Sequence, residues 1–198
     1  MIGRSRFLLL YLNAFVIGGV LMGFEMLGSR YLFPYFGGGI ATWAGLISTV
    51  LVALTIGYFL GGAIIDKFPT ARVIAISVAL AASYMALIPL AADQAMSSIL
   101  HGLGYGGTGI LAASASLCLI PLSLLGMFSP VAVRLLTNSK EGTGRTAGMV
   151  YGVSTLGNVF GTLFTTFTLI PAIGSRNITY LFAGVLALCT VSLSLASE

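Results

Sequence analysis

Charged residues are scarce in this sequence. They make up 7% of the 198 residues, while 58% are hydrophobic, and in ordinary soluble domains about 25% are charged. This composition excludes a soluble domain and indicates an integral membrane protein. Apolar stretches long enough to cross a bilayer, roughly 20 residues each, occur at 7–33, 40–65, 70–92, 107–136, 145–172 and 177–197. We therefore expect an all-α integral membrane protein, with six transmembrane helices in a single domain over residues 1–198.

Side chains that bind metals or carry redox chemistry are few as well. His101 is the only histidine, and the only cysteines, Cys118 and Cys189, fall inside predicted spans, where they indicate no redox compartment. The sequence has no metal-ligand cluster, no pair of nearby aspartates inside the spans and no nucleophile elbow. The glycine-rich stretch 102–109 lacks the Lys and the Ser or Thr of a P-loop. We expect no enzymatic activity, no metal and no cofactor.

The basic residues are unevenly placed along the chain. If the N-terminus is cytoplasmic, seven of the nine lie on the inner side, and only Arg30 and Arg176 lie on the outer side. The inner seven are Arg4, Arg6, Lys67, Arg72, Arg134, Lys140 and Arg145. This is the bias of the positive-inside rule. It explains the net charge of +4 as a topology signal, so we expect both termini in the cytoplasm and no nucleic-acid partner.

The first span contains an acidic side chain. In the stretch Gly18 to Gly37, which reads GGVLMGFEMLGSRYLFPYFG, Glu25 lies among apolar residues and Arg30 follows five residues later. Charges inside a bilayer are costly and usually face a protein interior or a watery cavity. Glu25 and Arg30 are therefore candidates for binding a substrate or an ion. The alternative is that Glu25 only holds two helices together.

Three uncharged polar residues inside predicted spans are further candidates for the site, namely Asn13, Ser123 and Asn158. Each of them also has a structural interpretation, because Ser, Thr and Asn side chains commonly hydrogen-bond between membrane helices. For Asn158 we favour such a hydrogen bond to a neighbouring helix over contact with a ligand.

Glycines recur four residues apart, a spacing that lets two helices approach closely. The pairs are Gly57 and Gly61 in the second span, and Gly148 with Gly152 and Gly157 with Gly161 in the fifth. We expect both spans to make close helix–helix or dimer contacts.

The loop after the second span carries a recognisable pattern. Gly62, Asp66, Lys67 and Arg72 resemble the cytoplasmic loop motif between helices two and three of major facilitator transporters. Pro69 stands where that motif usually has its second glycine, and only one of its paired arginines is present. The resemblance implies a role for these residues in conformational change.

A wider resemblance covers over half of the chain. The segments FEMLGSRYLFPYFGGGIATWAGLISTVLVALTIGYFLGGAIIDK, LLGMFSPVAVRLL and GRTAGMVYGVSTLGNVFGTLFTTFTLIPAIGSR resemble the membrane half of bacterial fused major facilitator and spermidine synthase proteins. The resemblance implies a multi-pass protein of the bacterial inner membrane. In such fusions a soluble aminopropyltransferase-like domain follows, and this sequence stops at Glu198, so no catalytic residue of that domain is carried over.

The same resemblance implies an architecture. Each six-helix half of a major facilitator consists of two inverted three-helix repeats, in which spans one and four line a cavity, two and five join the halves, and three and six face lipid. Since six helices make half of such a transporter, the expected assembly is a homodimer with a closed twofold. By this analogy Asp66 approaches the start of the partner's fifth span, near 144–148, where helix N-terminal amides attract anions.

Two functions remain open. The first is a secondary transporter for a small polar solute, such as a polyamine or another organic cation, that works by alternating access; Glu25 would bind the cation or carry a coupling proton. The second is a non-transporting membrane scaffold for a separately encoded synthase-like enzyme. The cytoplasmic surface of the chain is small, comprising residues 66–72 and 139–145, which argues against a large docking platform.

Overall fold

The computed structural model describes residues 4–137 and 142–195, with side chains from Phe7 onward. The described residues are almost entirely helical and include no strand, which confirms the expected all-α class. The helices are α1 (Arg4–Phe36), α2 (Ile40–Lys67), α3 (Arg72–Leu103), α4 (Gly107–Gly126), α5 (Phe128–Leu136), α6 (Thr143–Phe164), the π-helical turn η2 (Thr165–Leu169) and α7 (Ile170–Leu195). Lys140 lies outside the described residues, as do the side chains of Arg4 and Arg6.

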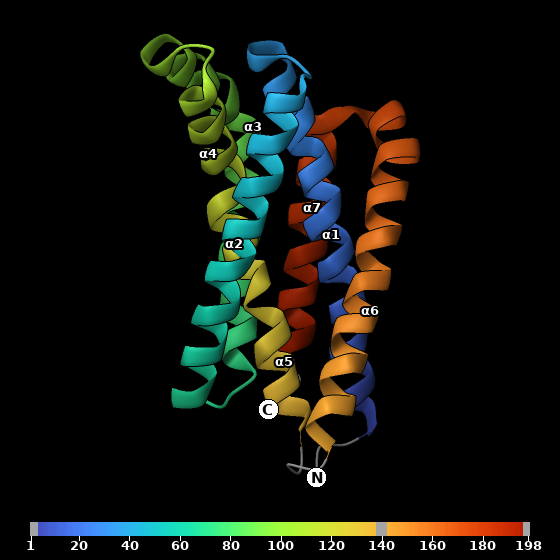
Figure 1. Cartoon of the computed structure of the whole chain (residues 1–198). Coiled ribbons are helices and arrows are strands. Elements are labelled where there is room, and N and C mark those ends of the chain that lie inside the picture. The colour runs from blue at the N-terminus through green and yellow to red at the C-terminus, as the bar shows by residue number, and fades with distance from the viewer. Residues whose placement is uncertain (1–3, 138–141, 196–198) are drawn as a thin grey trace.

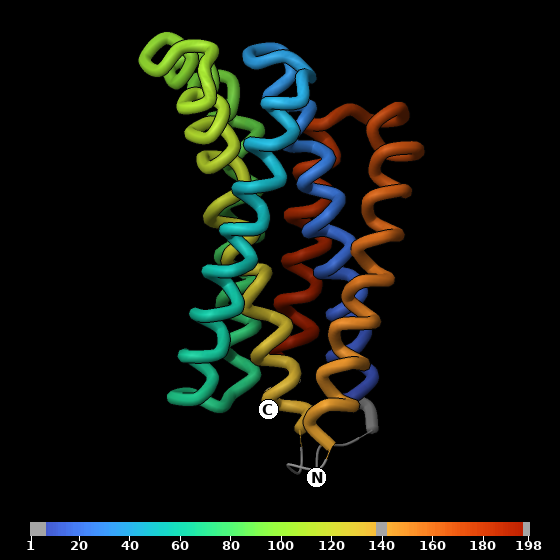
Figure 2. The backbone as a smooth tube through the Cα atoms, in the orientation of Figure 1, coloured from blue at the N-terminus to red at the C-terminus, as the bar shows by residue number. Residues whose placement is uncertain are grey.

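The helices form one elongated bundle (Figure 1). α1 begins and α7 ends at the same end, which we call the terminal end, and the backbone tube in Figure 2 shows the turns after α1, α3 and α6 at the opposite, distal end. Two of these turns contain glycines with positive φ, Gly37 (70°) and Gly104 (72°). A side chain there would be strained because L-residues rarely adopt this conformation.

Within the part of the chain that the structure describes, five helical stretches, not six, are long and apolar enough to cross a membrane: Phe7–Phe36, Ile40–Lys67, Arg72–Leu103, Gly107–Leu136 and Thr143–Leu195. The last has 53 residues and contains both the fifth and the sixth predicted spans. Within it the backbone leaves the helical conformation at Gly174 (φ 74°, ψ 158°), and Figures 1 and 2 show the chain bending there between α6 and α7. The five stretches indicate a multi-pass membrane protein.

Two helix boundaries differ from expectation. The third helix does not end near residue 92 but continues to Leu103, so most of the expected outer loop is helical. The fourth span, Gly107–Leu136, is interrupted at Met127 between α4 and α5. A cause is Pro130, which has no N–H to donate to the carbonyl four residues earlier, Gly126.

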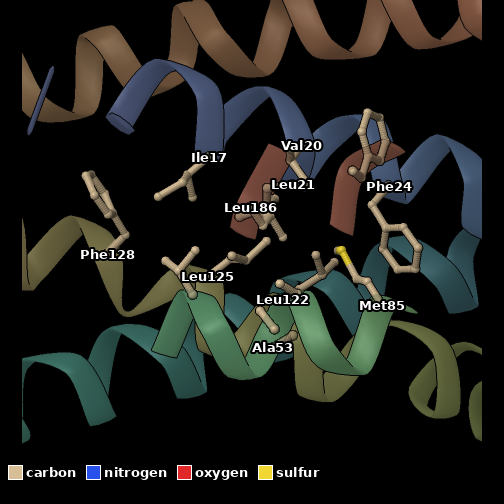
Figure 3. Packing of buried hydrophobic residues seen from close by; sticks show 14 of the residues in the cluster. Ile17, Val20, Leu21, Phe24, Ala53, Met85, Leu122, Leu125, Phe128 and Leu186 are labelled. Carbon is tan, nitrogen blue, oxygen red and sulfur yellow. The ribbon is translucent and has the colours of Figure 1, made fainter. Parts of the chain in front are cut away.

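The core lies where the helices pack pairwise. α1 packs most extensively on α6, α2 on α4, and α3 on α7. Figure 3 shows how side chains from these helices meet in the centre of the bundle, with Leu21 and Phe24 of α1 opposite Leu122 of α4 and Met85 of α3. These side chains are buried, whereas the outer faces of α2 and α6 carry many exposed apolar residues, which are open to lipid or to another protein chain.

Candidate functional site

Glu25 lies deep in the protein. Its side chain is 7% exposed, and α1 carries it inside the stretch Phe7–Phe36 that is long enough to cross the membrane. Among the described residues, no hydrogen bond or ion pair reaches it. A buried carboxylate without a partner is costly, and either a proton or a bound cation removes that cost.

The contacts of neighbouring glycines show which way Glu25 faces. A Cβ on Gly28 would lie 2.9 Å from Leu46 Cδ1 of α2 and 3.4 Å from Cys118 Sγ of α4. A Cβ on Gly18 would instead meet Ser154 and Asn158 of α6. At 3.6 residues per turn, Glu25 falls between these two directions. Glu25 therefore lies between the side of α1 that packs on α2 and α4 and the side that packs on α6.

Arg30 is not a partner of Glu25. Its side chain is exposed near the distal end of α1, and no ion pair joins it to a described residue. The ion pair that the described residues do contain links Arg176 of α7 to Asp93 of α3, at 3.4 Å between Nη2 and Oδ2. Tyr35 donates a hydrogen bond to the same carboxylate at 3.4 Å. Asp93 follows the predicted third span, 70–92, and was expected in a loop, so this group was not among the predicted site residues.

The ion pair between Asp93 and Arg176 is exposed on both sides, and exposed pairs contribute less than about 1 kcal/mol. We therefore expect Asp93→Asn to change the free energy of unfolding of the detergent-solubilised protein by less than about 1 kcal/mol. Thermal unfolding followed by circular dichroism measures this. A loss well above that value would mean that the pair is a structural requirement, and Asp93→Asn could then not serve as a control.

Asn13 has a structural partner far from Glu25. Its amide donates to the Ser192 hydroxyl of α7 at 3.0 Å and to the Leu9 carbonyl at 2.8 Å. Ser192 in turn donates to the Asn13 carbonyl oxygen at 3.2 Å. Glu25 lies twelve residues further along α1, roughly 18 Å at 1.5 Å per residue. The structure therefore does not bring these two candidates together.

Asn158 and Ser123 lie at helix crossings. With its amide nitrogen facing the carbonyl groups, Asn158 donates to the Gly18 carbonyl oxygen of α1 at 2.8 Å and to that of Ser154 at 3.3 Å. This is the hydrogen bond to a neighbouring helix that the sequence favoured. Ser123 donates to the Leu119 carbonyl at 2.6 Å within α4, and its own carbonyl oxygen faces Gly57 of α2.

The glycine pairs divide into two kinds. Gly57 and Gly61 pack on α4 and α5, where a Cβ on Gly61 would lie 2.8 Å from the Met127 carbonyl oxygen. Gly157 and Gly161 pack on the α1 backbone at Phe15 and Gly19. By contrast, no atom lies within 4 Å of a Cβ on Gly148 or Gly152. Only this last pair remains open for contact with another molecule.

The residues of the loop motif lie at the terminal end of the bundle. Asp66, Lys67 and Arg72 are exposed, and space is also open around Gly62. An open cleft of about 680 Å³ lies between the end of α2, α5 and the start of α6, lined by residues that include Asp66, Arg134 and Tyr151. Arg134 and Tyr151 were not expected at a site, since nothing in their local sequence distinguishes them.

No group of three or more potential metal ligands occurs within the described ranges 4–137 and 142–195. Comparison of the chain with known protein families, curated proteins and solved structures gives no match.

Proposed function

We propose that the chain is a six-helix half of a major-facilitator-like transporter of the bacterial inner membrane, similar to the membrane part of the fused spermidine synthase proteins. In this proposal the bend at Gly174 divides Thr143–Leu195 into two spans, which brings the number to six. The terminal end, with Lys67, Arg72 and Arg134, faces the cytoplasm under the positive-inside rule.

An inverted repeat within the chain is supported by matching contacts. The pairing of α1 with α6 has a counterpart in the pairing of α2 with α4, as two repeats related by a twofold in the membrane plane require. The contacts of individual glycines agree when each α2 residue is matched to an α6 residue at one fixed offset along the chain, and each α1 residue to a residue of the fourth span at another. Gly57 meets Ser123 as Gly157 meets Phe15, Gly61 meets Met127 as Gly161 meets Gly19, and Gly126 meets Leu54 as Gly18 meets Ser154.

The activity that we propose is secondary transport of a small organic cation, such as a polyamine, by alternating access. The single observation that carries it is Glu25, a buried carboxylate without a described partner inside a span. Intramembrane carboxylates commonly belong to substrate or proton pathways. The position of Glu25 between α4 and α6 suits the wall of a cavity that a second half would complete.

The second half would be a second copy of the chain. In the most apolar part of α2, 28% of the residues are buried, compared with 50% in the most apolar part of α3. α2 therefore has more free surface for a partner than α3, which this architecture assigns to lipid. Gly148 and Gly152 leave space on α6. Both helices belong to the surface that joins the halves in this architecture, and a closed twofold would use it on both copies.

Uptake by proteoliposomes tests the transport proposal. Purified protein is reconstituted, and entry of radiolabelled putrescine and spermidine is compared with that of glutamate and phosphate, with and without an inwardly directed proton gradient. We expect saturable uptake of the cations alone. Absence of flux and binding for all four solutes, together with co-purification of a soluble synthase-like enzyme, would contradict transport and favour the membrane scaffold.

Asp66 provides a test of the dimer. If its carboxylate contacts the start of the partner's α6, Asp66→Ala removes an interaction of about 0.3–1 kcal/mol with helix N-terminal amides. We expect a dimer dissociation constant several-fold higher, measured by single-molecule photobleaching in liposomes at increasing dilution. Asp93→Asn removes a carboxylate at the distal end and is the matched control. If Asp66→Ala leaves both dimerisation and transport unchanged, the proposed role is wrong.

A further inference from the structure

A small cavity lies where five helices of the bundle meet. It has a volume of about 30 Å³ and is lined by residues of α1, α2, α4, α5 and α6. We call it the crossing cavity, and define it by Gly18, Tyr58, Ser129, Ser154 and Asn158, together with the apolar side chains around them. It is separate from Glu25, which does not line it.

Polar groups without partners face this cavity. Ser129 is buried, and the Ser154 hydroxyl points toward α1, 3.0 Å from the position of a Cβ on Gly18. No hydrogen bond joins either hydroxyl to another residue in the described part of the chain. Asn158 uses its amide nitrogen for the carbonyls of Gly18 and Ser154, which leaves its oxygen free to accept. Buried polar groups usually have a partner, so these side chains form a binding site for a small polar ligand.

The size and charge of the cavity define that ligand. A cavity needs about 10–15 Å³ of space that the centre of a water molecule can occupy in order to hold one water. The crossing cavity has about 30 Å³ of such space, which is enough for one or two waters but too small for an organic solute. No charged side chain lines the cavity, so nothing there neutralises an ion. Hydroxyl and amide groups can offer the two to four hydrogen bonds that a buried water makes.

We propose that the crossing cavity binds one or two water molecules, held by the side chains of Ser129, Ser154 and Asn158. The water joins α6 to α5 by hydrogen bonds at the place where these helices cross α1. Hydrogen bonds through water are nearly as favourable as direct ones, and they can re-form when the helices shift. This inference depends on the cavity alone and would hold whether or not the protein transports a solute.

Radiolytic hydroxyl-radical labelling with mass spectrometry tests the proposal on the intact protein in nanodiscs. Radicals formed from bound water label adjacent side chains even where bulk solvent has no access. Phe128 lines the cavity and is 2% exposed, whereas Phe24 is 0% exposed and does not line it. We expect Phe128 to be labelled several-fold faster than Phe24. Equal rates for the two phenylalanines in the wild-type protein would overturn the proposal.

Substitutions then identify the groups that hold the water. The double variant Ser129→Ala and Ser154→Ala is expected to lower the labelling rate of Phe128 several-fold. Ser114→Ala is the matched control, because Ser114 is a buried hydroxyl without a partner elsewhere in α4. An unchanged Phe128 rate in the double variant would also overturn the proposal. The comparison of Phe128 with Phe24 needs no variant, so a poorly folded double variant would not remove the test.

Discussion

Glu25→Gln is expected to abolish cation transport while leaving the protein folded. The substitution keeps the shape of the side chain but removes its ability to carry a negative charge or to release a proton. Because Glu25 has no described partner, no counter-ion is left unpaired by the change. We expect uptake of putrescine and spermidine by proteoliposomes to fall at least about tenfold, which corresponds to roughly 1.4 kcal/mol of lost binding.

Melting temperature separates this effect from unfolding. Removing a buried charge without a partner should leave stability unchanged or raise it, since burying an unpaired charge is costly. Asp93→Asn, which changes a carboxylate at the distal surface, should leave uptake unaltered. If Glu25→Gln retained wild-type flux for every solute transported by the parent protein, the carboxylate would have no part in the mechanism.

Gly161→Val is expected to have the largest effect on stability. Its Cβ would overlap the backbone of α1 at Gly19, and backbone atoms cannot move aside as the end of a flexible side chain can. Overpacking a core commonly costs about 1–3 kcal/mol and occasionally more, and here we expect the upper part of this range or beyond. The measurements are the yield of monodisperse protein and the midpoint of thermal unfolding in detergent.

The matched control lies on the same helix. Gly152→Val places the same side chain where no atom of the protomer lies within 4 Å, so we expect a much smaller loss of monomer stability. In the proposed dimer, Gly152→Val should instead weaken the association of two copies. Equal destabilisation by the two variants would contradict the assignment of Gly161 to the contact between α1 and α6.

The sequence was sufficient to predict a membrane protein made of helices, because composition and the length of apolar runs alone determine both. It also predicted close packing of the second and fifth spans. It could not predict which neighbour each glycine meets, since a small residue only makes a helix face approachable. Gly161 packs on α1 and Gly152 on the same helix contacts no other described helix, because of where α1 lies in the bundle. The spacing of glycines along one helix does not encode that position.

The candidate site was predictable in part. The rarity of acids in apolar runs identified Glu25, and its burial agrees with that interpretation. Arg30 was selected as a second charge in the same span and Asn13 as a polar residue within it, but Arg30 is exposed at a helix end and Asn13 is bonded to Ser192 of a helix distant in sequence. Such long-range pairings, like that of Asp93 with Arg176, arise only when the bundle is assembled.

The burial of both cysteines has a practical consequence for measuring motion in this protein. Cys118 and Cys189 are free and buried, so their thiols are shielded from water-soluble maleimides in the folded state. Fluorescent or spin probes can therefore be attached to single cysteines engineered at exposed positions, such as Tyr151, without first removing the native ones. Distances between probes on two copies would then show whether the proposed dimer forms and whether its protomers move relative to each other.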